Sequence, residues 1–173
     1  SPTLPATTAT PPPTASPVVA PTTTVTGTQI LIASRVSLAD QQAALNTVRE
    51  ANSLLRLAIT RASPENLANL QRLWQGQALT DTKSYAIEVN SRYKEPFDVE
   101  LEYATPLTVS EQSVPRQIVV FSNEKWTYGG PSRQDQENFE FIYTVTPKDD
   151  GWVISRYTYR NWPGAQPSPT PAN

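Results

Sequence analysis

The feature of this sequence that most restricts its fold is a change in the spacing of apolar residues at Pro96. Before Pro96, apolar residues recur at intervals of three, four and seven, as in helices with one buried face. After Pro96, apolar and polar residues alternate, as in strands with one buried face. Helices followed by an antiparallel meander predict an α+β domain, with two to three N-terminal helices packed on one face of a four-stranded antiparallel sheet.

Two helix starts are marked in the first half of the domain. Ser37 is a suitable N-cap with Asp40 in the capping-box position, and an amphipathic helix of about 25 residues is expected to follow. Ser63 and Pro64, with an acidic first turn, mark the start of a second helix. The apolar face of the second helix consists of Leu67, Leu70, Leu73 and Trp74, and Gly76 weakens its end.

Residues 80–93 fit two structures. Tyr85, Ile87 and Val89 alternate with polar residues as in a strand. Glu88 and Arg92, however, form an i,i+4 pair of opposite charge, which stabilises a helix. The helical signals outnumber the alternation, and we expect a third helix here.

Four strands are expected after Pro96. They cover residues 97–103 with a short continuation at 107–109, and then 117–128, 139–145 and 152–159. The second strand ends at two glycines followed by a proline. The last two strands are joined by the turn 148–151, in which Gly151 is able to take a positive φ.

The 17 proline residues concentrate at the two ends of the chain. Residues 1–28 and 163–173 have a Pro/Thr-rich composition that predicts disordered, extended tethers. Between them, residues 29–162 form the α+β domain, and roughly 130 residues suffice for one hydrophobic core. The plain interpretation of the tethers is a linker and a tail.

A sharper interpretation makes the N-terminal tether a lipoprotein stalk. The chain starts at Ser1 without an initiator Met, as a mature or trimmed terminus would, and a lipidated Cys directly before Ser1 would anchor it. The longest apolar run, residues 30–33, is far too short to cross a bilayer. We therefore expect an extracytoplasmic domain whose contact with a membrane is limited to such an anchor.

Charge and composition exclude several function classes. The formal net charge of −2 and the isoelectric point of about 5.2 offer no basic surface, and no nucleic-acid partner is expected. The chain has no Cys and no His, which excludes a thiolate nucleophile, an imidazole base and the usual zinc sites. We expect no metal and no cofactor.

Three segments resemble the nuclear-transport-factor-2-like superfamily, also called ketosteroid-isomerase-like or cystatin-like. They are Leu67-x-x-Leu70-x-x-Leu73-Trp74, Glu124-Lys-Trp126-Thr-Tyr128, and Gly151-Trp152-x-Ile154-x-x-Tyr157. The resemblance covers residues 38–159 and implies a cone-like fold, with a pocket between a curved sheet and the helices. Enzymes, binding modules and dimerisation domains all use this fold, and the superfamily's dehydratases depend on a His that this chain lacks. The Pro/Thr flanks resemble those of bacterial surface proteins.

Polar residues on the strands are the candidates for chemistry. Glu124, Glu140, Tyr128, Tyr143 and Arg156 could face a pocket, where a carboxylate beside a Tyr would abstract a proton. Because buried charge is costly, we favour Glu124 and Glu140 facing solvent or pairing with Arg156.

A second acidic group lies on the first strand, where Asp98, Glu100 and Glu102 share one side. They could meet a calcium ion, but an acidic outer face is the favoured interpretation. The sequence Asp149-Asp150-Gly151 is interpreted as a turn.

Aromatic residues on the later strands are the richest candidates for binding. They could line a groove for a sugar, an apolar ligand or a peptide, or they could form the core facing the helices. We favour the core for Trp126 and Trp152 and leave both alternatives open for Tyr157, Tyr159 and Trp162. The candidate ligand- or partner-binding residues are Trp126, Tyr128, Tyr143, Arg156, Tyr157, Tyr159 and Trp162.

Three functions follow, in order of preference. The first is a non-catalytic extracytoplasmic interaction domain, an accessory subunit of an envelope complex with a protein partner. The second is a binding module for a small sugar or apolar molecule. The third is an acid/base enzyme without His, which would need a buried carboxylate near a Tyr, opening on the pocket.

Overall fold

The computed structural model describes residues 36–93, 96–130 and 134–162, and over these residues the helices precede the strands, as predicted. The helical part comprises α2 (Leu38–Thr60), α3 (Pro64–Asn69), the 3-10 helix η1 (Leu70–Arg72) and α4 (Gly76–Ser91). The strands are β1 (Asp98–Tyr103), β2 (Thr108–Val109), β3 (Ile118–Gly129), β4 (Gln134–Lys148) and β5 (Gly151–Asn161). The predicted tethers, residues 1–28 and 163–173, lie outside the described residues.

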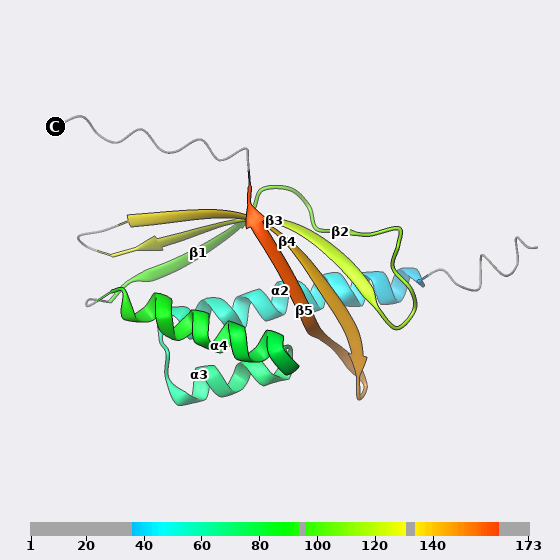
Figure 1. The fold of residues 1–173 in the computed structure, drawn as a ribbon, viewed down its shortest axis with the longest axis horizontal. Coiled ribbons are helices and arrows are strands. Elements are labelled where there is room, and N and C mark those ends of the chain that lie inside the picture. Colours follow the sequence, from blue (N-terminus) through cyan, green and yellow to red (C-terminus); the bar gives the residue numbers. More distant parts are fainter. Residues whose placement is uncertain (1–35, 94–95, 131–133, 163–173) are drawn as a thin grey trace, which may run out of the picture.

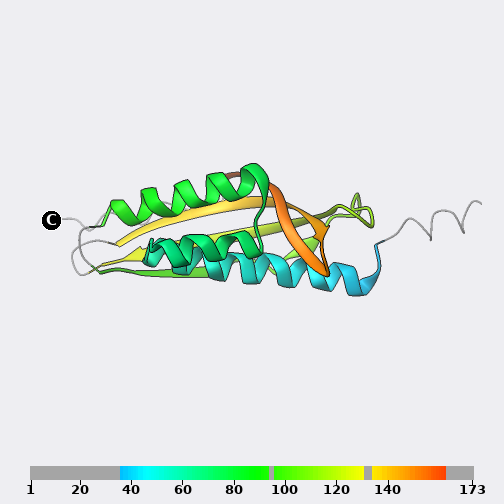
Figure 2. The same ribbon diagram turned by 90° about the horizontal axis from the view of Figure 1, so that it is seen from below.

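The sheet is an antiparallel meander with the order β1-β3-β4-β5, and the short β2 also pairs with β3. It is curved and unclosed, since β1 and β5 are its two edges. The helices lie on one side of the sheet, below β1 in Figure 1, and the β4–β5 hairpin reaches past α2, in front of which it lies in Figure 2. The predicted α+β class, with helices covering one face of an antiparallel sheet, is confirmed.

Local signals account for the helix starts. The Ser37 hydroxyl oxygen accepts a hydrogen bond from the Asp40 backbone N–H at 3.0 Å, which caps α2. The Ser63 hydroxyl oxygen caps α3 in the same way, ahead of the proline at the first helical position. The third predicted helix is confirmed as α4, where Arg92 pairs with Glu88 at 2.8 Å.

Two predictions about the second helix are wrong. The second helix does not continue to Trp74, because η1 interrupts it and the following segment bonds to the edge of the sheet: Ile154 N–H donates to Leu73 O at 2.8 Å. Gly76 does not weaken that helix but begins α4, with a φ of 56° that favours glycine. In the β4–β5 turn the positive φ, 49°, belongs to Asp149 and not to Gly151.

The core lies between the helices and the inner face of the sheet. Along β3, every second residue from Ile118 to Tyr128 is buried, as the alternation predicts. The buried face of α2, including Ala44, Val48 and Ala51, packs in the same cluster. Among the described residues, no helix is long and apolar enough to span a membrane.

Candidate functional site

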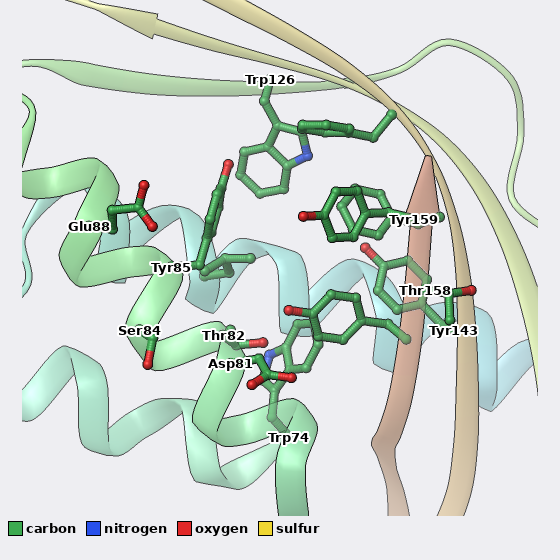
Figure 3. A pocket seen from close by; sticks show the side chains of 14 residues that line it. Trp74, Asp81, Thr82, Ser84, Tyr85, Glu88, Trp126, Tyr143, Thr158 and Tyr159 are labelled. Carbon is green, nitrogen blue, oxygen red and sulfur yellow. The ribbon is translucent and has the colours of Figure 1, made fainter. Parts of the chain in front are cut away.

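A pocket of about 590 Å³ lies between α4 and the inner face of β4 and β5 (Figure 3). Eight of its fourteen lining residues are aromatic: Trp74, Tyr85, Trp126, Phe139, Phe141, Tyr143, Tyr157 and Tyr159. The others are Leu55, Asp81, Thr82, Ser84, Glu88 and Thr158. The pocket therefore combines a large apolar surface with a few polar groups, as small-molecule sites do.

A β-bulge brings the aromatic residues of β5 to the pocket. Val145 on β4 pairs with Ile154, whereas Thr144 pairs with Arg156, so Ser155 is an extra residue on β5. Without this bulge, regular alternation of all residues from the buried Ile154 onward would turn Tyr157 outward. With it, Tyr157 pairs with Tyr143 on the inner face, and Tyr159 follows on the same face.

The rings form a continuous floor. The Trp74 ring contacts those of Tyr157 and Tyr143 edge-on, with centroids 5.7 and 6.2 Å apart. Phe141 stacks on Tyr143 at 5.3 Å, and Phe139 meets Tyr159 at 5.3 Å. Such pairs hold each other in defined orientations. The surface facing the cavity therefore consists of aromatic rings that contact one another.

The pocket is closed at one end and open at the other. Trp74, Trp126 and Tyr143 are buried, Tyr157 is half-buried, and Tyr159 is 60% exposed. Tyr159 therefore forms part of the rim, while the buried rings form the closed end. The Trp74 indole N–H is also buried and has no hydrogen-bond partner in the described parts of the chain.

Glu124 is fully buried behind this floor. Its Oε1 accepts hydrogen bonds from Asn52 Nδ2 at 2.8 Å and from the Tyr143 hydroxyl at 2.9 Å, and its Oε2 accepts one from Trp126 Nε1 at 2.8 Å. Burial raises the pKa of Glu124, and the donors, first among them Trp126, oppose that rise. Glu124 does not line the pocket, but two of the side chains that donate to it, Trp126 and Tyr143, do.

The preferred sequence interpretation is therefore wrong for Glu124, whereas Glu140 lies on the outer face of β4 in an exposed ion pair, as favoured. Glu124 is in phase with Trp126 on β3 and points inward, and three donors offset the cost of burying it. Glu140 forms its ion pair with Arg160 at 2.8 Å rather than with Arg156.

A second carboxylate lies behind Tyr85. The hydroxyls of Tyr85 and Tyr128 are 2.6 Å apart, and they donate to Glu137 Oε2 at 3.0 and 3.2 Å. Arg92 Nη1 lies 3.4 Å from the other oxygen of Glu137. Burial raises the pKa of both tyrosines well above the usual range, so they remain protonated donors near neutral pH.

The structure brings together four of the seven predicted binding residues: Trp126, Tyr143, Tyr157 and Tyr159 line the pocket. Tyr128 lies behind Tyr85, and neither Arg156 nor Trp162 lines the cavity. Trp126 thus belongs both to the core and to the pocket wall, and Trp152 is partly buried against the core.

Sequence reasoning missed the contribution of α4 and part of β4. Asp81, Tyr85 and Glu88 line the pocket and recur at i, i+4 and i+7, which is a signal for one helix face. Phe139 and Phe141 were expected as strand residues without a role, yet both line the pocket.

The acidic residues of β1 are exposed, as favoured, and Glu102 pairs with Lys125 at 3.4 Å. Within the described ranges, no three Asp or Glu residues are grouped so that they could hold a metal ion.

Comparison with known proteins finds no matching family model and no matching curated protein. Among solved structures, the chain is similar to an IcmL-like type IV secretion system protein from Legionella pneumophila, with a TM-score of 0.55 and 11% identity over 76% of this chain and 99% of that one. The intermembrane space region of the chloroplast protein ARC6 gives a TM-score of 0.49 and 18% identity over 74% and 99% of the two chains. At such identities the likeness to the IcmL-like protein shows a shared fold.

Proposed function

We propose that this chain is a non-catalytic binding domain that acts outside the cytoplasm and takes its ligand in the aromatic pocket. One observation carries the proposal: the pocket is open at Tyr159 and closed at Trp74, and eight aromatic side chains line it. Its volume of about 590 Å³ lies within the range of small-molecule sites.

The buried indole N–H of Trp74 has no acceptor among the described residues. A buried donor without an acceptor costs about 1–3 kcal/mol, and proteins rarely leave one unsatisfied. The Trp74 ring lines the closed end of the pocket, but its Nε1 atom has almost no exposed surface there, so a ligand acceptor would reach it only after a neighbouring side chain moves.

The surroundings of Glu124 support a role without catalysis. A buried carboxylate within hydrogen-bond distance of a Tyr is present, as an acid/base enzyme requires, but it does not open on the pocket. Both of its oxygens already accept hydrogen bonds from protein donors. The pocket tyrosines with raised pKa values are donors rather than bases.

The same geometry supports membership of the nuclear-transport-factor-2-like superfamily, which we propose as the chain's relationship. The concave face of a curved antiparallel sheet, covered by N-terminal helices with a pocket between them, agrees with the fold that the sequence resemblance implies. The Pro/Thr-rich composition of residues 1–28 supports a tether, and a lipid attached ahead of Ser1 would make the chain a bacterial lipoprotein.

An accessory role in an envelope complex is the second candidate. The outer edge of β5 is bonded at Ile154, by Leu73 and Gln75, and beyond that point it has no strand partner among the described residues. Such an edge can pair with a strand of a partner protein. The IcmL-like secretion system protein shows that a secretion system also uses this fold.

Ligand titration followed by NMR tests the first candidate, because the indole N–H groups of Trp74 and Trp126 report on the pocket. A panel of small apolar and aromatic compounds is expected to shift these two signals selectively. Tyr159→Ala should weaken binding by roughly three- to tenfold, since one exposed ring contributes about 1 kcal/mol. Phe121→Ala is the matched control, because Phe121 is an exposed aromatic residue that does not line the pocket. Equal losses in both variants, or no shift with any compound, would refute the pocket as the ligand site.

Photo-crosslinking in the cell envelope tests the second candidate. A photoreactive residue at Arg156, exposed near the outer edge of β5, is expected to give one discrete protein adduct. The same residue placed at Phe121 serves as the control. Identical adducts from both positions would exclude specific pairing at β5.

A further inference from the structure

We propose that the pocket selects a small organic cation of the quaternary ammonium type. This inference rests on the proposed function, since it assigns a ligand class to the same pocket. Three features carry it: the charges at the rim, the faces of the aromatic rings, and the carboxylates behind those rings.

The rim of the pocket is acidic. Asp81 and Glu88 on α4 both line it, and none of the lining residues is Lys or Arg. Asp81 accepts a hydrogen bond from Gln77 at 2.6 Å and has no ion-pair partner in the described parts of the chain. Glu88 shares its charge with Arg92 at 2.8 Å. The potential at the opening therefore favours a positive ligand over a negative one.

The interior of the pocket is made of ring faces and edges. The π face of an aromatic ring carries partial negative charge, and alkylated ammonium groups are bound in pockets of such rings. Trp attracts a cation most strongly, followed by Tyr and Phe. Two Trp, four Tyr and two Phe side chains line this pocket.

Carboxylates behind three of these rings strengthen the attraction. Trp126 and Tyr143 each donate a hydrogen bond to Glu124, at 2.8 and 2.9 Å, and Tyr85 donates one to Glu137 at 3.0 Å. A ring that donates an N–H or O–H to an anion gains electron density, so its face attracts a cation more strongly. This gives the buried Glu124 a role in binding although it never meets the ligand.

The chemistry of the lining distinguishes among cations. A metal ion needs several converging oxygen ligands, and no group of three or more potential ligands is found within the described ranges. An alkylated ammonium group instead carries its charge inside an apolar surface. It loses little hydration on entering and packs against the rings.

Choline and its neutral isostere 3,3-dimethylbutan-1-ol are the decisive pair of probes, because they differ in the charged nitrogen alone. Titration of the intact domain, followed by the indole N–H signals, should show choline binding roughly tenfold more tightly, with affinity falling as salt rises. Asp81→Asn should weaken choline two- to fivefold and leave the alcohol unchanged. Glu65→Gln, which removes an exposed carboxylate of α3 outside the pocket lining, is the matched control and should change neither.

Tyr85→Phe tests the carboxylates behind the rings. The substitution keeps the ring and removes its hydrogen bond to Glu137, so choline should bind roughly two- to threefold more weakly while the alcohol does not. Thermal unfolding of each variant shows whether the fold is intact.

The outcomes separate this inference from the proposed function. Equal affinity for choline and the alcohol would overturn the selection of a cation and leave the pocket as a ligand site. Absence of binding by every apolar compound would overturn the proposed function itself. If a trimethyllysine peptide bound far more tightly than choline, the ligand would be a modified side chain of a protein partner, and the proposal of a small-molecule ligand would be wrong.

Discussion

Two regions of the same inner sheet face combine aromatic rings with carboxylates, yet one is sealed and the other is open. Under α2, Asn52 reaches Glu124 and completes a buried network in which both carboxylate oxygens are satisfied. Beside α4, Asp81 and Tyr159 are exposed at the rim of the open pocket. The comparison indicates that the sealed region holds the fold together, while the open region is available for binding.

Removing the buried carboxylate should have the largest effect on stability. Glu124→Leu leaves the Trp126 N–H buried without an acceptor, and it leaves Tyr143 and Asn52 only their longer hydrogen bonds, at 3.3 Å to Asn52 and at 3.4 Å to Tyr103. We expect the free energy of unfolding to fall by about 3 kcal/mol. Urea denaturation measures the change. Glu100→Leu, at an exposed carboxylate on β1, should stay within about 0.5 kcal/mol. Similar values for the two variants would remove the distinction between the regions.

The pH dependence of stability sharpens the same point. Burial raises the pKa of Glu124 in the folded state, so between its unfolded and folded pKa values the folded state binds the proton more strongly. The carboxylate's contribution is therefore most favourable below the unfolded pKa and decreases as pH rises through the folded one. Relative to Glu124→Gln, the wild-type free energy of unfolding should decrease over that window. An increase with pH would mean that the donors outweigh burial.

A backbone substitution at the start of α4 should perturb the open region alone. Gly76 has a φ of 56°, and an added Cβ would meet no atom within 4 Å, so Gly76→Ala should cost about 1 kcal/mol through the backbone. Gly129→Ala also has free space but no positive φ, and it should cost less. In Gly76→Ala, the rate of backbone amide hydrogen exchange is expected to increase in α4, whereas the amides near Asn52 should exchange as slowly as in the wild type. Equal quickening in both regions would show that they unfold together.

The smallest effect is expected at the rim. Tyr159 is 60% exposed, so Tyr159→Ala should change the free energy of unfolding by no more than about 0.5 kcal/mol while weakening ligand binding. Thermal unfolding and the ligand titration are run on the same samples. A large loss of stability would place Tyr159 in the core rather than at the mouth of a pocket.

Much of the fold could be predicted because local signals agree with the tertiary structure. The caps at Ser37 and Ser63 and the alternation along β3 depend only on neighbours in the sequence. The burial of Glu124 was predicted incorrectly, although its phase with Trp126 pointed inward. Its partner Asn52 lies 72 residues away, and no sequence pattern shows that the two meet.

The pocket was only partly predictable for the same reason. Tyr157 and Tyr159 face it because of the extra residue Ser155, and the register that reveals this bulge is a property of strand pairing. Tyr85 and Asp81 complete the wall because α4 crosses β5, an arrangement that spacing within a helix does not determine. The alternation of apolar and polar residues predicts a row of aromatic side chains on the sheet. It does not predict which helix faces that row across the pocket.

The bulge at Ser155 also uncouples two parts of the final strand. Ile154 on one side of it belongs to the core, and Tyr157 and Tyr159 on the other side belong to the pocket. Deleting Ser155 would remove the bulge, yet Ile154 would still pair with Val145 and Tyr157 with Tyr143, so both tyrosines would stay on the inner face. A related or redesigned chain that lacks this one residue would thus present the same aromatic lining on a regular strand.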